Sequence, residues 1–129
     1  LGPTDIGAFY DITLDFLFYS LFPIAFIFVD IKNAYAICFL LLSFVSTQTT
    51  FLASAWIIEK NKILVSTKQK KSFFYIDGIT EGFETIICFT LMLLFYESVE
   101  LITYIFGILC WITSISRLIF IRKLLRSYS

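Results

Sequence analysis

Two aspartates and a glycine at the head of the first apolar run have a spacing that suits ion or phosphate chemistry. Asp11 and Asp15 are four residues apart, and Gly7 stands four residues before Asp11. On a helix the three positions share one face, one turn apart. Two carboxylates about 6 Å apart repel each other in a low dielectric, and a divalent cation removes that repulsion. The pattern therefore predicts an ion or phosphate site, where Gly7 leaves room for a bulky group.

Charged residues on two later apolar segments extend this candidate site. Glu81 and Glu84 stand at the start of the third apolar run, and Arg117 stands near the end of the fourth. Ionisable residues inside membrane segments are rare and are usually functional. We expect all three to contribute to substrate binding. The alternative is that Glu81 or Glu84 pairs with Arg117 and only holds the helices together.

The composition predicts a membrane protein. The chain has 129 residues, of which 59% are hydrophobic, and the apolar residues come in long runs. Four of these runs are long enough to cross about 30 Å of hydrocarbon as helices. We therefore expect an all-α, polytopic bundle of four transmembrane helices, with residues 1–129 forming a single domain. The predicted spans are residues 6–29, 34–58, 78–96 and 101–121, and the predicted long loop is residues 59–76.

The distribution of basic residues predicts the orientation of these spans. Lysines gather in the loop 59–76, and basic residues also close the chain at 122–126, whereas the turns at 30–33 and 97–100 are poor in them. Basic loops stay on the cytoplasmic side of a membrane. The start of the first span, with its two aspartates, then lies at the cytoplasmic side, so we expect a site that faces the cytoplasm.

The second span and the cysteines look structural. Residues 43–54 are dense in serine and threonine, which allow close helix packing, although lining a substrate cavity is the alternative. Cys38, Cys88 and Cys110 stand far apart in mid-span and are expected to be small buried apolar residues. Histidine is absent, which excludes histidine-based triads and zinc sites, and a net charge of zero argues against a nucleic-acid partner.

The spacing of Gly7, Asp11 and Asp15 at the start of a membrane helix resembles the second half of the CDP-alcohol phosphotransferase signature, G-x-x-x-D-x-x-x-D. The first half, D-x-x-D-G-x-x-A-R, would lie upstream of Leu1. We therefore interpret the chain as a fragment that corresponds to the last four helices of a six-helix fold. The resemblance also implies a homodimer.

The resemblance implies a metal-dependent transferase of phospholipid biosynthesis. Such an enzyme moves a phosphoalcohol, such as phosphatidyl from CDP-diacylglycerol, to an acceptor alcohol and releases CMP. By this resemblance Asp11 is a ligand of Mg²⁺ or Mn²⁺, Asp15 is a ligand and the general base, and Gly7 lets the nucleotide approach. The fragment itself is expected to be inactive, because half of the motif is absent. The alternatives are a small ion-coupled transporter and a non-catalytic membrane scaffold.

Overall fold

The computed structural model describes residues 3–62 and 82–127, and within them every regular element is helical. Glu81, most of the predicted loop 59–76 and the predicted start of the third span lie outside the described residues. The elements are α1 (Pro3–Val29), η1 (Ile31–Asn33), α2 (Ala34–Lys60), α4 (Glu84–Leu94), η3 (Tyr96–Ser98) and α5 (Val99–Ser127).

Three described segments are long and apolar enough to cross a membrane. They are Thr4–Val29, Ile31–Lys60 and Tyr96–Ser127, and the most apolar 18-residue stretches within them have mean hydropathies of 2.1, 1.7 and 1.8. They contain the first, second and fourth predicted spans, so the prediction of a helical membrane bundle is confirmed. The third predicted span is represented by the 11 residues of α4, a shorter apolar helix. An 11-residue helix is only about 16 Å long, roughly half of the hydrocarbon thickness.

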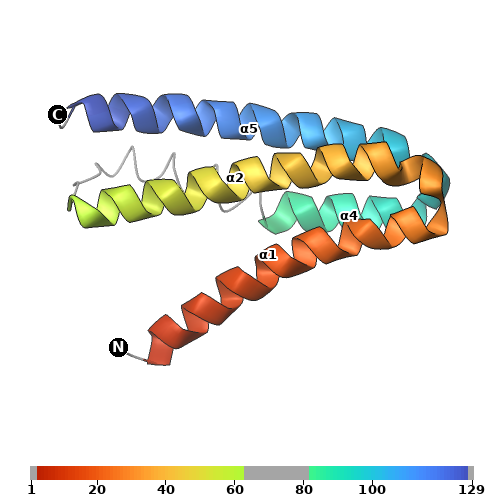
Figure 1. Ribbon diagram of the computed structural model, residues 1–129, viewed down its shortest axis with the longest axis horizontal. Coiled ribbons are helices and arrows are strands. Elements are labelled where there is room, and N and C mark those ends of the chain that lie inside the picture. Colours follow the sequence, from red (N-terminus) through yellow and green to blue (C-terminus); the bar gives the residue numbers. More distant parts are fainter. Residues whose placement is uncertain (1–2, 63–81, 128–129) are drawn as a thin grey trace.

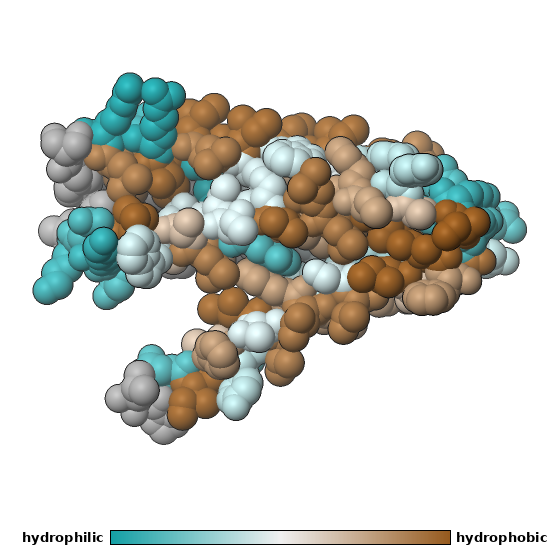
Figure 2. Space-filling model, viewed as in Figure 1, coloured by the Kyte–Doolittle hydropathy of each residue, from teal (hydrophilic) through white to brown (hydrophobic). Residues whose placement is uncertain are grey.

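The helices meet at one end of the bundle and spread toward the other (Figure 1). We name the end with η1 and η3 the turn end, and the end with the N-terminus of α1 and the C-termini of α2 and α5 the basic end. The helices α2 and α5 run parallel and share the most extensive interface in the described chain. The helix α1 packs on α2 and α4 near the turn end and diverges from them toward its own N-terminus. Figure 2 shows hydrophilic residues at both ends and apolar residues over the middle.

Aromatic side chains hold α1 against α2 and α4. The rings of Phe22 and Phe89 stack with their centroids 4.3 Å apart, and Tyr19 and Phe44 each contact Phe89 edge-on at 6.2 and 6.4 Å. Phe26, Phe44 and Phe89 are buried. Aromatic pairs of this kind contribute beyond the area that they bury. The core therefore joins α1, α2 and α4 in the second half of α1, away from Asp11 and Asp15.

The predicted turn at 30–33 is confirmed as the short helix η1 between α1 and α2. The Asp30 carboxylate accepts a hydrogen bond from the backbone N–H of Lys32 at 3.0 Å. The side-chain amide of the buried Asn33 donates to the backbone carbonyl of Phe26 at 3.0 Å. The same carbonyl also accepts from the backbone N–H of Asp30 at 3.2 Å, so two donors hold it at the end of α1. These contacts fix the direction in which α2 returns alongside α1.

Small residues allow α2 and α5 to approach closely. Ser43 and Thr47 are buried, and their hydroxyls donate to carbonyls of α2 itself, at 2.6 Å to Leu40 and 2.9 Å to Phe44. These two hydroxyls therefore support packing through their size and through bonds within their own helix. On the α5 side, Gly107 lies directly against the ring of Phe39.

The prediction for the cysteines is confirmed for two of the three. Cys88 and Cys110 are buried in the core, whereas Cys38 is exposed, so the prediction that it is buried is wrong. Cys38 follows the fully buried Ile37 on α2. A step of one residue turns a side chain by about 100° around a helix, which directs Cys38 away from the neighbouring helices.

Candidate functional site

Gly7, Asp11 and Asp15 all lie within α1, so they share the face that their spacing predicts. All three are exposed, in the part of α1 that diverges from the other helices (Figure 1). A Cβ atom added to Gly7 would meet no atom within 4 Å. The face is therefore open to a ligand or to another protein segment.

The depth of the two aspartates follows from the helical rise. If Val29 marks the hydrocarbon boundary at the turn end, a span of about 30 Å reaches back to about Phe9 or Tyr10. Asp11 then lies about 3 Å inside the opposite boundary and Asp15 about 9 Å inside it. A charged Asp at a helix centre costs about 2.5–3.5 kcal/mol on the insertion scale. Asp15 is thus deep enough to need a polar or cationic partner.

Glu84 is the first residue of α4 and is half-buried. It lines a groove of about 350 Å³ between α4 and α5, whose other walls include Cys88, Ile102 and Phe106. Its carboxylate is the charged group of an otherwise apolar groove. The groove lies between different helices from the open face of α1. Among the described residues, therefore, Glu84 is not brought together with Asp11 and Asp15.

Arg117 is the most deeply buried charge of the described chain, with 1% of its surface exposed. Its Nη1 donates to the backbone carbonyl of Thr47 at 2.6 Å and to the hydroxyl of Thr50 at 3.1 Å. The guanidinium carbon lies 5.9 Å from the centroid of the Phe51 ring. A buried guanidinium needs hydrogen-bond acceptors, and α2 supplies them, so these contacts hold α5 against α2 at this depth.

The contacts of Arg117 with α2 were not predicted from the sequence, which suggested either a substrate or the carboxylate of Glu81 or Glu84 as its partner. The available signal was the hydroxyl-rich stretch 43–54, which contains both Thr47 and Thr50. A threonine hydroxyl has one proton and two lone pairs. Thr50 can therefore donate to the Ser46 carbonyl at 2.8 Å while it accepts from Arg117. Pairing of Arg117 with Glu81 or Glu84 stays a prediction, and Glu81 lies outside the described residues.

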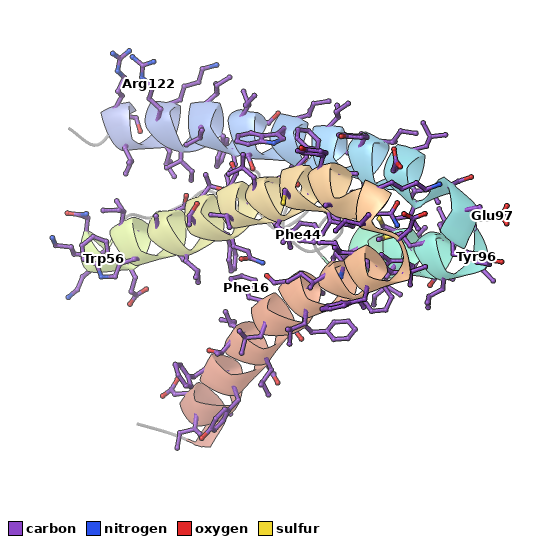
Figure 3. The ribbon with its side chains drawn as sticks, turned by 45° about the vertical axis from the view of Figure 1, so that its right-hand side comes forward. Phe16, Phe44, Trp56, Tyr96, Glu97 and Arg122 are labelled. Carbon is purple, nitrogen blue, oxygen red and sulfur yellow. The ribbon has the colours of Figure 1, made fainter. Side chains whose placement is uncertain are left out.

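A small pocket lies where α1, α2, α4 and α5 meet. Thr47, Gln48 and Thr85 contribute its polar lining, and Phe16 and Phe44 face it from α1 and α2 (Figure 3). Its volume is about 10 Å³, which is close to the space that one water molecule needs. The hydroxyl-rich stretch therefore does line a cavity, but this one is too small for a nucleotide.

Of the expected metal site, the described residues contain the two carboxylates of Asp11 and Asp15. Within residues 3–62 and 82–127 there is no group of three or more His, Cys, Asp or Glu side chains placed to hold a metal ion. Mg²⁺ demands six oxygen ligands and usually keeps several waters beside one or two carboxylates. Asp11 and Asp15 can supply those carboxylates but not a complete ligand shell.

Comparison with known proteins agrees with the membrane character of the chain. It is 45% identical over 115 residues to "Inner membrane protein YnjF" of Escherichia coli (strain K12). The similarity covers 88% of this chain and 56% of that protein, so the chain spans about half the length of this relative. No family model matches the chain, and no solved structure matches it. The chain is an integral membrane protein. Its long apolar helices and the name of this relative agree on that point.

Proposed function

We propose that the chain is part of a membrane transferase resembling the CDP-alcohol phosphotransferases of phospholipid biosynthesis. Such an enzyme passes a phosphoalcohol, such as phosphatidyl from CDP-diacylglycerol, to an acceptor alcohol and releases CMP. The observation that carries the proposal is the open face of α1, where Gly7, Asp11 and Asp15 are exposed at membrane depth. The same proposal includes four membrane spans in this chain, a six-helix fold of the parent protein, a site that faces the cytoplasm and a homodimer.

The residues of this face fit a hard divalent cation. Asp11 and Asp15 are carboxylates one helical turn apart, and both are accessible. Mg²⁺ or Mn²⁺ held there would offset negative charge on phosphoryl oxygens. Further ligands would come from the motif half expected upstream of Leu1.

The candidate site residues have different roles in the proposed reaction. Gly7 leaves the helix surface clear for the nucleotide. Asp15 accepts the proton of the acceptor hydroxyl, which makes the oxygen a better nucleophile. Glu81, Glu84 and Arg117 bind substrate from the third and fourth apolar segments. For Arg117 this requires that its guanidinium, now bonded to Thr47 and Thr50, also reach a substrate anion.

The test is CMP release from CDP-diacylglycerol by the purified full-length protein, with Mg²⁺ or Mn²⁺ and a panel of acceptor alcohols. We expect turnover by the unmodified protein and its loss in Asp15→Asn. Asp5→Asn is the matched control, because Asp5 lies on the same helix but off the face of Asp11 and Asp15. Turnover by Asp15→Asn would refute the assignment of the base.

Two further measurements separate the proposal from its alternatives. Residues 1–129 alone should release no CMP, and turnover by them would contradict the division of the site between the two motif halves. Ion flux through liposomes that contain the full-length protein, without CMP release under any condition, would favour the transporter. Neither activity in a folded protein would favour the scaffold.

A further inference from the structure

The largest of the described pockets lies between α2 and α5 at the basic end and has a volume of about 690 Å³. We name it the α2–α5 groove. Six residues define it here: Thr49, Ala53, Ile57, Leu118, Arg122 and Arg126. It shares no lining residue with the small central pocket. The groove is therefore separate from the centre of the bundle, and α1 with its aspartates does not contribute to it.

Two kinds of chemistry meet in this groove. Leu118 and Ile57 belong to an apolar wall, while Arg122 and Arg126 bring two positive charges from successive turns of α5. Thr49 and Thr50 add hydroxyls on the α2 side. An apolar channel with cationic donors at one end complements an amphiphile that has an anionic head and a hydrocarbon tail.

The two ends of the groove lie at the depths that such an amphiphile needs. If α5 enters the hydrocarbon at Val99, about 30 Å of span ends near residue 119, so Arg122 and Arg126 lie about 4 and 10 Å beyond the boundary. On α2, Lys60 lies over the ring of Trp56 at 4.7 Å from its centroid, a pairing typical of the headgroup region. Figure 3 shows Trp56 and Arg122 at the same end of the bundle. The cationic part of the groove is thus at headgroup depth and Leu118 at tail depth.

We propose that the α2–α5 groove binds an anionic phospholipid, whose headgroup phosphate lies on Arg122 and Arg126 and whose acyl chain lies along Leu118 and Ile57. A soluble phosphate compound would leave the apolar wall uncovered, and a zwitterionic headgroup would bring its own positive charge close to Arg122 and Arg126. This site requires only that the protein be embedded in a membrane, so it does not depend on the proposed transferase activity.

Native mass spectrometry of the full-length protein tests the proposal. The protein is released from mixed micelles with equal amounts of phosphatidylglycerol and phosphatidylcholine, and the ratio of the bound lipids is measured. Each basic residue near a membrane surface contributes enough attraction for anionic lipid to change binding about fivefold. We expect the unmodified protein to prefer phosphatidylglycerol and Arg122→Gln to lower this preference about fivefold. Lys123→Gln is the matched control, because Lys123 is exposed beside Arg122 but does not line the groove.

Three results would overturn the proposal. They are equal retention of both lipids by the unmodified protein, an equal loss of preference in Lys123→Gln, and displacement of the lipid by soluble glycerol phosphate. The second result would show that the attraction comes from the charge of the whole basic end.

A photo-crosslinker in place of Ala53 identifies the occupant directly. Ala53 is exposed on the α2 side of the groove, so the replacement leaves the packed helix surfaces unchanged. A covalent adduct with the mass of a phospholipid supports the proposal. An adduct to a second copy, or to another part of the same protein, would show that protein fills the groove and would overturn it.

Discussion

Replacing Gly107 with alanine should disturb the interface between α2 and α5 more than any comparable change at an exposed position. An added Cβ would lie 2.5 Å from Cε1 and 2.7 Å from Cδ1 of the Phe39 ring. Ordinary contacts between carbon atoms are about 3.5–4.0 Å long. The ring must therefore move by about 1 Å, and it already packs against Tyr104 with the ring centroids 5.5 Å apart.

Two opposing terms set the size of the effect. Overpacking of a close interface costs about 1–3 kcal/mol, whereas Gly→Ala in a helix interior gains about 1 kcal/mol in helix propensity. We expect a net loss of about 1 kcal/mol in the free energy of unfolding of Gly107→Ala. Phe39→Leu removes the ring that the new methyl group would meet. In that background the same Gly107→Ala change should become neutral or stabilising, by up to about 1 kcal/mol.

A double-mutant cycle measures this reversal. Unfolding of the four proteins is followed in mixed micelles by circular dichroism as the SDS fraction rises. The expected coupling between Gly107→Ala and Phe39→Leu is about 1–2 kcal/mol, in the direction of rescue. An equal loss in both backgrounds would mean that the contact with Phe39 does not explain the glycine. No loss in either would refute the close approach of the two helices.

Three other substitutions separate stability from chemistry. Gly7→Ala should leave the free energy of unfolding unchanged or raise it by up to about 1 kcal/mol, because no atom of another helix lies within 4 Å of the new methyl group. The same change should lower CMP release at least tenfold. Unchanged CMP release would show that Gly7 does not contact the nucleotide. Asp11→Asn should abolish any rise in the thermal unfolding temperature that Mg²⁺ gives the unmodified protein, and a rise that persists would remove Asp11 from the metal site. Arg117→Gln should lower the free energy of unfolding by about 1.5–3 kcal/mol, because the charge-assisted hydrogen bonds to Thr47 and Thr50 are lost. An unchanged free energy of unfolding would show that these bonds do not stabilise the protein.

The sequence predicted the helices well because hydropathy reports membrane burial directly. The spans expected at 6–29 and 34–58 appear as α1 and α2, and the turn between them appears as η1. Hydropathy does not say which face of an apolar helix meets protein and which meets lipid. Cys38 shows this limit, because both faces of α2 are apolar there and only the packing decides exposure.

The candidate site could be predicted only in part. A shared face for Gly7, Asp11 and Asp15 follows from their spacing once α1 is a helix. Glu84 and Arg117 were assigned to the site because, with alternating spans, the start of the third apolar run and the end of the fourth lie at the same depth as the start of the first. Depth fixes one coordinate, whereas contact needs the angle around each helix as well. Among the described residues, Glu84 lines a groove between α4 and α5, and Arg117 donates a hydrogen bond to α2.

Helix packing and the proposed chemistry occupy different halves of α1. Its second half carries Phe22 and Phe26, which bind it to the aromatic core, while its first half carries the exposed Asp11 and Asp15. In the most apolar stretch of α1 only 11% of the residues are buried, against 33% in those of α2 and α5. A carboxylate about 9 Å inside the hydrocarbon is unfavourable without a partner, and no packing between described helices compensates for it at Asp15. In the proposed enzyme a divalent cation on Asp11 and Asp15 would relieve this penalty, so the residues that disfavour the insertion of α1 would also favour the binding of the cation.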